Sequence, residues 1–207
     1  MIITEEQFKE WNDAITCAQF RNPYSLRLFK EKYPDLFRHM TSMLRKRTKL
    51  RTTIEAFRSV SPFVYWGALT WSEEENDLNE LSKRKQATRF LDKFFACYVY
   101  VEEYGEEEGR YHIHFFGLMS KFYTFDEMYN EWHSRLEIEC LKDYQCSKKI
   151  KYVTKYAVKD VPRLHMNARA KQLVLDYRQK KKFDSIGFEC LTRDYWTKIV
   201  DLYDLPF

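Results

Sequence analysis

Glycine and proline are scarce in this chain, with five of each among 207 residues. No glycines stand in a Gly-x-x-x-x-Gly-Lys-Ser/Thr arrangement, the loop whose backbone amides hold the phosphates of ATP. The sequence therefore excludes a P-loop ATPase, and any ATP-driven step has to come from another protein.

Cysteine and long apolar runs are also limited. The five cysteines are odd in number and form no Cys-x-x-Cys pair, which argues against a disulfide framework and a zinc ribbon and favours a reducing compartment. No apolar run approaches the length that spans a bilayer, and Met1 begins a polar segment without a signal core. We expect a soluble intracellular protein without membrane contact, located in the cytoplasm or, in a eukaryotic host, in the nucleus or an organelle.

Aromatic residues, by contrast, are abundant. They make up 17% of a chain that is 44% hydrophobic, which is enough for one substantial core with an extension. Aromatic surfaces suit nucleic acid, although they also simply fill cores. The net charge of +4 is too small to indicate a polyanionic partner, so local clusters have to carry that argument.

Residues 1–60 are predicted to form a helical extension. Thr4 and Gln7 have the spacing of a capping box, and Pro23 and Pro34 divide the region into short helices. A basic run follows at Arg45, Lys46, Arg47, Lys49 and Arg51. This run either tracks a phosphate backbone or is a solvated helix face.

Residues 61–207 are predicted to form an α+β domain. Aromatic and β-branched residues predict strands at 63–71, 97–104 and 110–117, the last two joined as a β-hairpin by the turn 105–109. Helical spacing predicts helices at 78–95, 124–132, 168–177 and 195–203. A further helix is predicted to begin after Ser147 as its N-cap and to end at Pro162.

Two of the five histidines, His112 and His114, lie two residues apart in the second strand of the predicted hairpin. Side chains alternate along a strand, so both imidazoles project from one face, as a pair of metal ligands would. The facing strand offers Glu102 and Glu103 as a third ligand. An ordinary surface or core pair is the alternative that this pattern leaves open.

The predicted helix after Ser147 has two distinct sides. One side carries tyrosines and lysines at the i, i+3, i+4, i+7 spacing, namely Tyr152, Lys155, Tyr156 and Lys159. Nearly opposite lies an apolar stripe that would seat the helix on the sheet, formed by Ile150, Val153, Ala157 and Val161. A generic amphipathic helix with outward aromatics is the alternative.

These two patterns together predict phosphoryl transfer. A tyrosine hydroxyl has a pKa near 10 and needs help to attack a phosphodiester at neutral pH. A divalent ion polarises the phosphate, and a neighbouring lysine holds the phosphate and favours the phenolate. A Tyr/Lys stripe that faces a His/His/Glu ion therefore predicts a nuclease with a tyrosine nucleophile.

The residues resemble the HUH endonucleases, specifically the Rep initiators of rolling-circle replication with two tyrosines. Three ordered motifs carry the resemblance over residues 61–190: the Thr70-ended strand Ala68-Leu69-Thr70-Trp71, the pair His112-Ile113-His114, and the tyrosine helix. Glu103-Tyr104-Gly105 and Gly109-Arg110 are similar as well. Any one of these motifs is weak, and their ordered combination is specific.

The resemblance implies a five-stranded antiparallel sheet with flanking helices and a divalent metal ion, Mg²⁺ or Mn²⁺. It implies nicking of single-stranded origin DNA of a plasmid or virus, with a 5′-phosphotyrosine intermediate and a free 3′-hydroxyl. Tyr152 and Tyr156 would alternate in cleavage and rejoining. Since the chain lacks a helicase domain, a separate helicase and a host polymerase are the implied partners.

The third metal ligand stays open at this point. The resemblance favours Glu103, but strand alternation places Glu103 on the face of Val99 and Val101, which are expected in the core. Glu102 is the alternative, and a β-bulge at the turn would reconcile the two.

Contacts with DNA are predicted at Arg110, beside the histidine strand, and at Lys151, before the tyrosine helix. Further candidates are Lys148, Lys149 and the run 180–182 for phosphates, and Tyr111 or Trp71 for stacking on bases. Two alternatives to a replication initiator remain. One is a two-tyrosine transposase or relaxase with the same chemistry, and the other is a non-catalytic nucleic-acid-binding protein with structural histidines.

Overall fold

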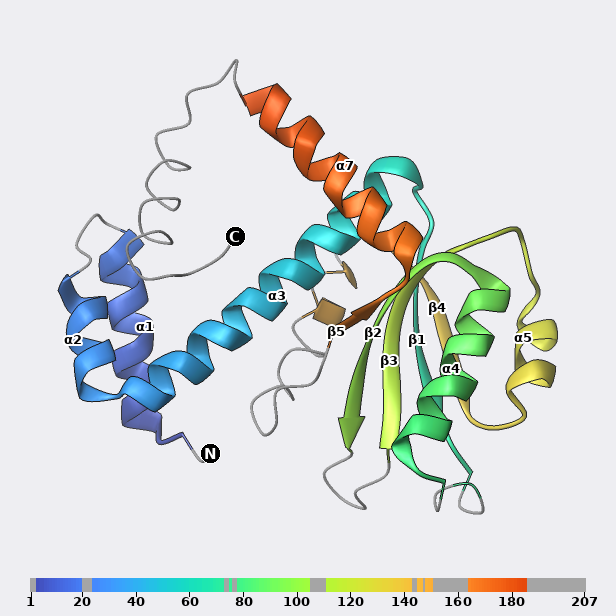
Figure 1. The fold of residues 1–207 in the computed structure, drawn as a ribbon, viewed down its shortest axis with the longest axis horizontal. Coiled ribbons are helices and arrows are strands. Elements are labelled where there is room, and N and C mark those ends of the chain that lie inside the picture. Colours follow the sequence, from blue (N-terminus) through green and yellow to red (C-terminus); the bar gives the residue numbers. More distant parts are fainter. Residues whose placement is uncertain are drawn as a thin grey trace.

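In the computed structural model, the described residues are 3–19, 24–72, 75, 78–104, 111–142, 145–146, 148–150 and 164–185. Five antiparallel strands in this part of the chain form one sheet in the order β4-β1-β3-β2-β5, and helices flank it (Figure 1). The α+β class with a five-stranded antiparallel sheet is therefore confirmed. The elements are α1 (Glu5–Gln19), α2 (Tyr24–Lys32), α3 (Pro34–Val60), β1 (Val64–Thr70), α4 (Glu80–Phe94), β2 (Phe95–Tyr104), β3 (Tyr111–Met119), α5 (Phe125–Trp132), β4 (Leu136–Leu141), β5 (Leu164–Met166) and α7 (Ala168–Ser185).

Helix α1 begins as the sequence predicts. The Thr4 hydroxyl accepts a hydrogen bond from the Gln7 amide at 3.2 Å, and the Gln7 side chain accepts one from the Thr4 amide at 3.0 Å. Pro34 stands in the first turn of α3, but this helix runs for 27 residues because no proline or glycine interrupts it, so the expectation of only short helices was wrong.

None of the described helices is both long enough and apolar enough to cross a membrane.

Helix α3 connects two hydrophobic cores. Its first half packs Leu36, Phe37 and Met40 against α1 and α2, whereas its second half packs residues such as Leu50 and Phe57 against the sheet. Figure 1 shows α1 and α2 at the end of α3 that is far from the sheet. The second half of α3 lies within the predicted extension 1–60, but it packs in the core of the sheet.

The two faces of the sheet carry different helices. Val101 and Phe116 face α3 and α7, whereas their strand neighbours Tyr100 and Phe115 face α4 and α5. This follows from the alternation of side chains along a strand. The sheet thus separates two cores, and the residue parity along β2 and β3 decides on which side a polar group lies.

Strands β4 and β5 were not among the predicted segments. β4 alternates apolar and acidic residues from Leu136 to Cys140, which is the pattern of a strand with one buried face. β5 has only three residues, too few for a periodic signal, and it exists because it pairs with β2. The sequence pattern of β4 was therefore sufficient to predict a strand, whereas that of β5 was not.

Gly67 in β1 marks a close approach between strands. A Cβ atom there would lie 2.5 Å from the backbone oxygen of Glu137 and 2.4 Å from the ring of Phe115. Because the backbone oxygen cannot rotate away, we expect Gly67→Ala to lower the free energy of unfolding by roughly 2–3 kcal/mol. Urea denaturation measures this loss. Gly117→Ala, which meets the Phe95 ring at 2.6 Å and a backbone oxygen only at 3.1 Å, should cost less, and the reverse order would contradict this packing.

Candidate metal centre

The β2–β3 hairpin brings three potential metal ligands together. Glu103 lies opposite His112 in the strand register, and Val101 lies opposite His114. One ligand atom from each of Glu103, His112 and His114 lies within 4.8 Å of the others. The Glu103 Oε2 and His114 Nε2 atoms are 2.8 Å apart. Two imidazoles and one carboxylate at such spacing could hold a divalent cation and leave positions open for other ligands.

The triad lies where an apolar face of the sheet ends. Val99 and Val101 are buried against α3 and α7, and Glu103 follows on the same face at the end of β2. Pairing is regular up to Tyr104 opposite Tyr111, and the register shift in this pair lies at the other end, between Phe95 and Cys97. The predicted conflict between a core face and a ligand therefore needs no bulge at this end of the described strands.

Glu102 points to the opposite face and is engaged there. It accepts hydrogen bonds from the Arg84 guanidinium at 2.6 and 2.8 Å, and the His165 Nε2 atom lies 2.8 Å from Glu102 Oε1. Burial alone would raise the pKa of Glu102, but the bonds from His165 and Arg84 outweigh it and lower this pKa to about 2. Glu102 is thus an anchor between α4, β2 and β5, and the alternative that it joins the two histidines was wrong.

The protonation of His112 suits metal binding. Burial lowers the pKa of His112, and the neighbouring His114 lowers it further, while Glu103 and Glu137 act in the opposite direction. The lowered pKa favours the neutral imidazole, which is the form that binds metal ions. His114 is itself buried, with an exposed fraction of 5%.

Trp66 is a neighbour of the triad that the sequence reasoning missed. Its ring stacks on His114 with centroids 5.8 Å apart and planes 16° apart, and the Lys149 ammonium lies 3.5 Å from the Trp66 ring centroid on β1. Lys149 also lies 3.1 Å from Glu139 of β4. Such packing restricts the His114 ring to one orientation. The sequence holds no signal for this contact, because it depends on the pairing of β1 with β3, in which Ala68 is the strand partner of His114.

The predicted tyrosine helix is described only at its start. Residues 145–146 and 148–150 are helical, and Ser147, the predicted N-cap, lies outside the described residues. Ile150 is buried in the same core as Trp66 and Val101, on the triad's side of the sheet, as the predicted apolar stripe requires. The other predicted site residues lie outside the described residues, namely Arg110, Lys151, Tyr152, Lys155, Tyr156 and Lys159.

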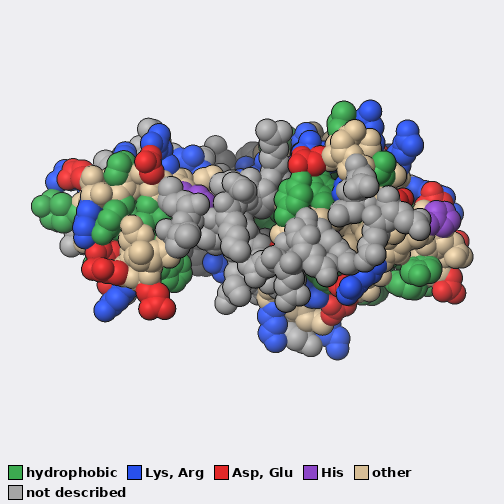
Figure 2. Space-filling view, turned by 90° about the horizontal axis from the view of Figure 1, so that it is seen from below, with side chains coloured by type: hydrophobic (Ala, Val, Ile, Leu, Met, Phe, Trp, Pro, Cys, Tyr) green, Lys and Arg blue, Asp and Glu red, His purple; other side chains and the backbone are tan. Residues whose placement is uncertain are grey.

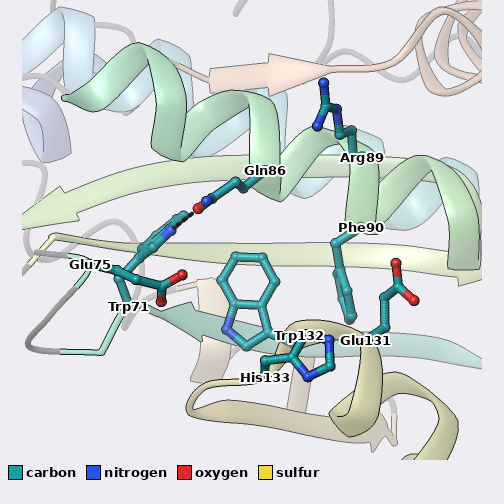
Figure 3. A pocket seen from close by; sticks show the side chains of 8 residues that line it. All are labelled: Trp71, Glu75, Gln86, Arg89, Phe90, Glu131, Trp132 and His133. Atoms are coloured by element: carbon teal, nitrogen blue, oxygen red, sulfur yellow. Dashed lines mark hydrogen bonds between the residues drawn. The ribbon is translucent and has the colours of Figure 1, made fainter. Parts of the chain in front are cut away.

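Neither aromatic candidate for base stacking is exposed. Tyr111 has an exposed fraction of 2% and Trp71 one of 5%, both in the core under α4 and α5. Trp71 lines a cavity of about 210 Å³, and its indole N–H donates to Gln86 (Figure 3). The Trp132 ring packs against Trp71 in the same cavity, with centroids 5.1 Å apart. These rings stabilise the core and do not offer an open stacking surface.

Comparison with known proteins adds no identification: no protein-family model matches the chain, and no curated protein matches it. The interpretation of the site therefore depends on its own residues and geometry.

Proposed function

We propose that this protein is a metal-dependent endonuclease and strand transferase of the HUH type, which nicks single-stranded DNA at an origin and starts rolling-circle replication. The observation that carries the proposal is the triad of Glu103, His112 and His114, whose ligand atoms lie within 4.8 Å of one another. The burial of Ile150 on the same side of the sheet supports it, because the tyrosines follow directly in the sequence.

The triad fits Mg²⁺ or Mn²⁺, which would be held by the Glu103 carboxylate and the two imidazoles. When bound, such an ion polarises the phosphate and stabilises negative charge on its oxygens. The hydroxyl of Tyr152 or Tyr156 gives its proton to water as its oxygen forms a bond to phosphorus, and the bond from phosphorus to the 3′ oxygen breaks. The 3′ oxygen leaves with the electron pair and takes up a proton, while Lys155 and Lys159 would hold the phosphate.

The products are a 5′-phosphotyrosine and a free 3′-hydroxyl. Because one phosphoester replaces another, the bond energy is kept and the reverse attack rejoins strands without ATP. This agrees with the lack of a P-loop in the sequence. Single-stranded origin DNA, a separate helicase and a host polymerase are the proposed partners.

The test is a search for covalent protein–DNA adducts. The full chain is incubated with a random-sequence pool of single-stranded oligonucleotides and Mn²⁺ or Mg²⁺, and denaturing gels separate covalent from bound DNA. We expect an adduct that EDTA prevents, with the DNA mapped by peptide mass spectrometry to Tyr152 or Tyr156. Recovery of no covalent DNA from the pool with either metal would contradict the proposal and favour a non-catalytic binding protein.

A further inference from the structure

Positive charge is concentrated in two helices that pack on each other, α3 and α7. The sequence of α3 contains seven Lys and Arg against two Asp and Glu, and that of α7 contains six against two. The two helices thus hold an excess of nine positive charges in a chain whose net charge is +4, which leaves the remainder at −5. On the face shown in Figure 2, charges of both signs are mixed wherever side chains are coloured.

Part of this charge forms a continuous strip across the two helices. Arg47, Arg51 and Glu55 follow one another at the i, i+4 spacing on α3. Glu55 lies 3.1 Å from Arg51 Nε and 3.2 Å from Lys181 Nζ of α7. Arg178 is the i−3 neighbour of Lys181 on α7. We call Arg47, Arg51, Arg178 and Lys181 the basic strip.

The basic strip is open to solvent. The side chains of Arg51 and Lys181 are 73% and 56% exposed, and Arg47 and Arg178 are exposed as well. Within the described part of the chain, Arg47 and Arg178 have no acidic partner, and Glu55 is shared by the other two cations. The strip therefore keeps an excess of positive charge that a polyanion could neutralise.

We propose that the basic strip binds the phosphate backbone of duplex DNA. Exposed arginines and lysines on a rigid helix pair make the sequence-independent phosphate contacts that position a protein on a duplex. The second half of α3 covers the same face of the sheet on which Glu103, His112 and His114 lie. That the bound duplex flanks the nicked strand rests on the proposed function, whereas the binding itself does not.

The surroundings of the strip favour a duplex over a single strand. Single-strand sites use exposed aromatic rings on which bases stack. The large apolar side chains exposed on the described parts of α3 and α7 are Leu44, Val60 and Leu175, none of which is aromatic. Tyr177 donates its hydroxyl to Glu55 and has the Lys181 ammonium 4.9 Å from its ring centroid. The strip thus offers charge without a stacking surface.

The same side chains argue against a membrane surface. A helix that lies on a lipid surface needs a continuous exposed apolar face. The larger apolar residues of α3, such as Leu50 and Phe57, are instead buried against the sheet. The three exposed ones are scattered over both helices. Anionic lipid is therefore an outcome for the test to exclude.

The test compares two variants of the full chain that lose the same charge. The strip variant carries Arg47→Gln, Arg51→Gln, Arg178→Gln and Lys181→Gln. The control variant carries Lys9→Gln, Lys30→Gln, Lys85→Gln and Lys121→Gln, at exposed positions outside α3 and α7. Binding to a labelled short duplex is measured by fluorescence anisotropy in EDTA at several salt concentrations, after thermal melts show that all proteins are folded.

We expect the strip variant to bind duplex at least about tenfold more weakly, with a salt dependence reduced by about three to four phosphate contacts, while the control variant changes much less. Glu55→Gln should act in the opposite direction and strengthen binding about threefold, because it removes the carboxylate between Arg51 and Lys181. The amide oxygen that this substitution introduces can still accept the Tyr177 hydroxyl, so the helix contact is kept.

Three results would overturn the inference. The first is a strip variant that binds duplex like the wild type or like the control variant. The second is a strip variant that loses as much affinity for a single strand of the same length as for the duplex. The third is binding to anionic phosphatidylserine vesicles without binding to DNA. Adduct formation on short single strands should persist in the strip variant, so failure of this inference and failure of the proposed nicking activity are distinguishable.

Discussion

Replacing Tyr152 and Tyr156 together by phenylalanine is expected to abolish covalent adduct formation, with a loss of at least about 10⁴-fold in the rate. The phenolic oxygen is the atom that bonds to phosphorus, and phenylalanine removes it while keeping the ring. The rate of adduct formation on a single-stranded substrate selected from the random pool, in Mn²⁺, measures this loss. Binding of the same DNA should change little, because the lysines and the metal triad remain.

A matched control is the double substitution Tyr24→Phe and Tyr129→Phe. Both tyrosines are about half exposed, at 53% and 49%, and lie on α2 and α5, away from the triad. The control should form the adduct at the wild-type rate. An adduct that survives in the Tyr152/Tyr156 variant would show that another residue attacks. The two single substitutions then distinguish which tyrosine acts first.

Glu103→Gln is expected to weaken metal binding, whereas Glu102→Gln is expected to lower the stability of the fold. Glu103→Gln removes an anionic ligand, so affinity for Mn²⁺ should fall by at least about 10–100-fold. Glu102→Gln leaves the triad intact and should change that affinity less than about twofold. It should instead lower the free energy of unfolding by roughly 1–3 kcal/mol, since Arg84 and His165 lose an anionic partner.

Calorimetric titration with Mn²⁺ and urea denaturation at neutral pH measure the two effects. The pH dependence gives a further check, because the pKa of Glu102 is lowered to about 2 in the folded state. A carboxylate with a lowered pKa stabilises the fold at pH values above its unfolded pKa and loses this contribution as the pH falls. The stability difference between Glu102→Gln and the wild type should therefore shrink from about pH 5 towards pH 2. Metal loss in Glu102→Gln with retention in Glu103→Gln would contradict the assignment of the ligand.

Local sequence signals predicted the elements that have a strong period of their own. The capping box at Thr4 and the alternation along β2 and β3 depend on neighbours within a few residues. Short helices were predicted because proline ends or kinks a helix, but neither proline nor glycine follows Pro34 within α3. β5 was missed because it is defined by its pairing with β2, which the sequence does not record.

The sequence predicted the two histidine ligands of the candidate site and left the choice of the carboxylate ligand open. Alternation alone placed His112 and His114 on one face. It could not choose between Glu102 and Glu103, because the face of Val99 and Val101 was expected to be core along its whole length. The structure shows that the core ends at Val101, and that Arg84 and His165 engage Glu102 on the other face.

By itself, the sequence determined the absence of an ATP-binding loop, the strand that carries two histidines on one face, and the α+β class. These properties follow from residue identity and from periods of two or 3.6 residues, which act over short distances along the chain. Only the tertiary structure decided that Glu103 joins the histidines, that Trp66 packs on His114, and that α3 and α7 combine their charge. Each of these depends on strand register or helix packing between residues far apart in the sequence, where no local period carries the information.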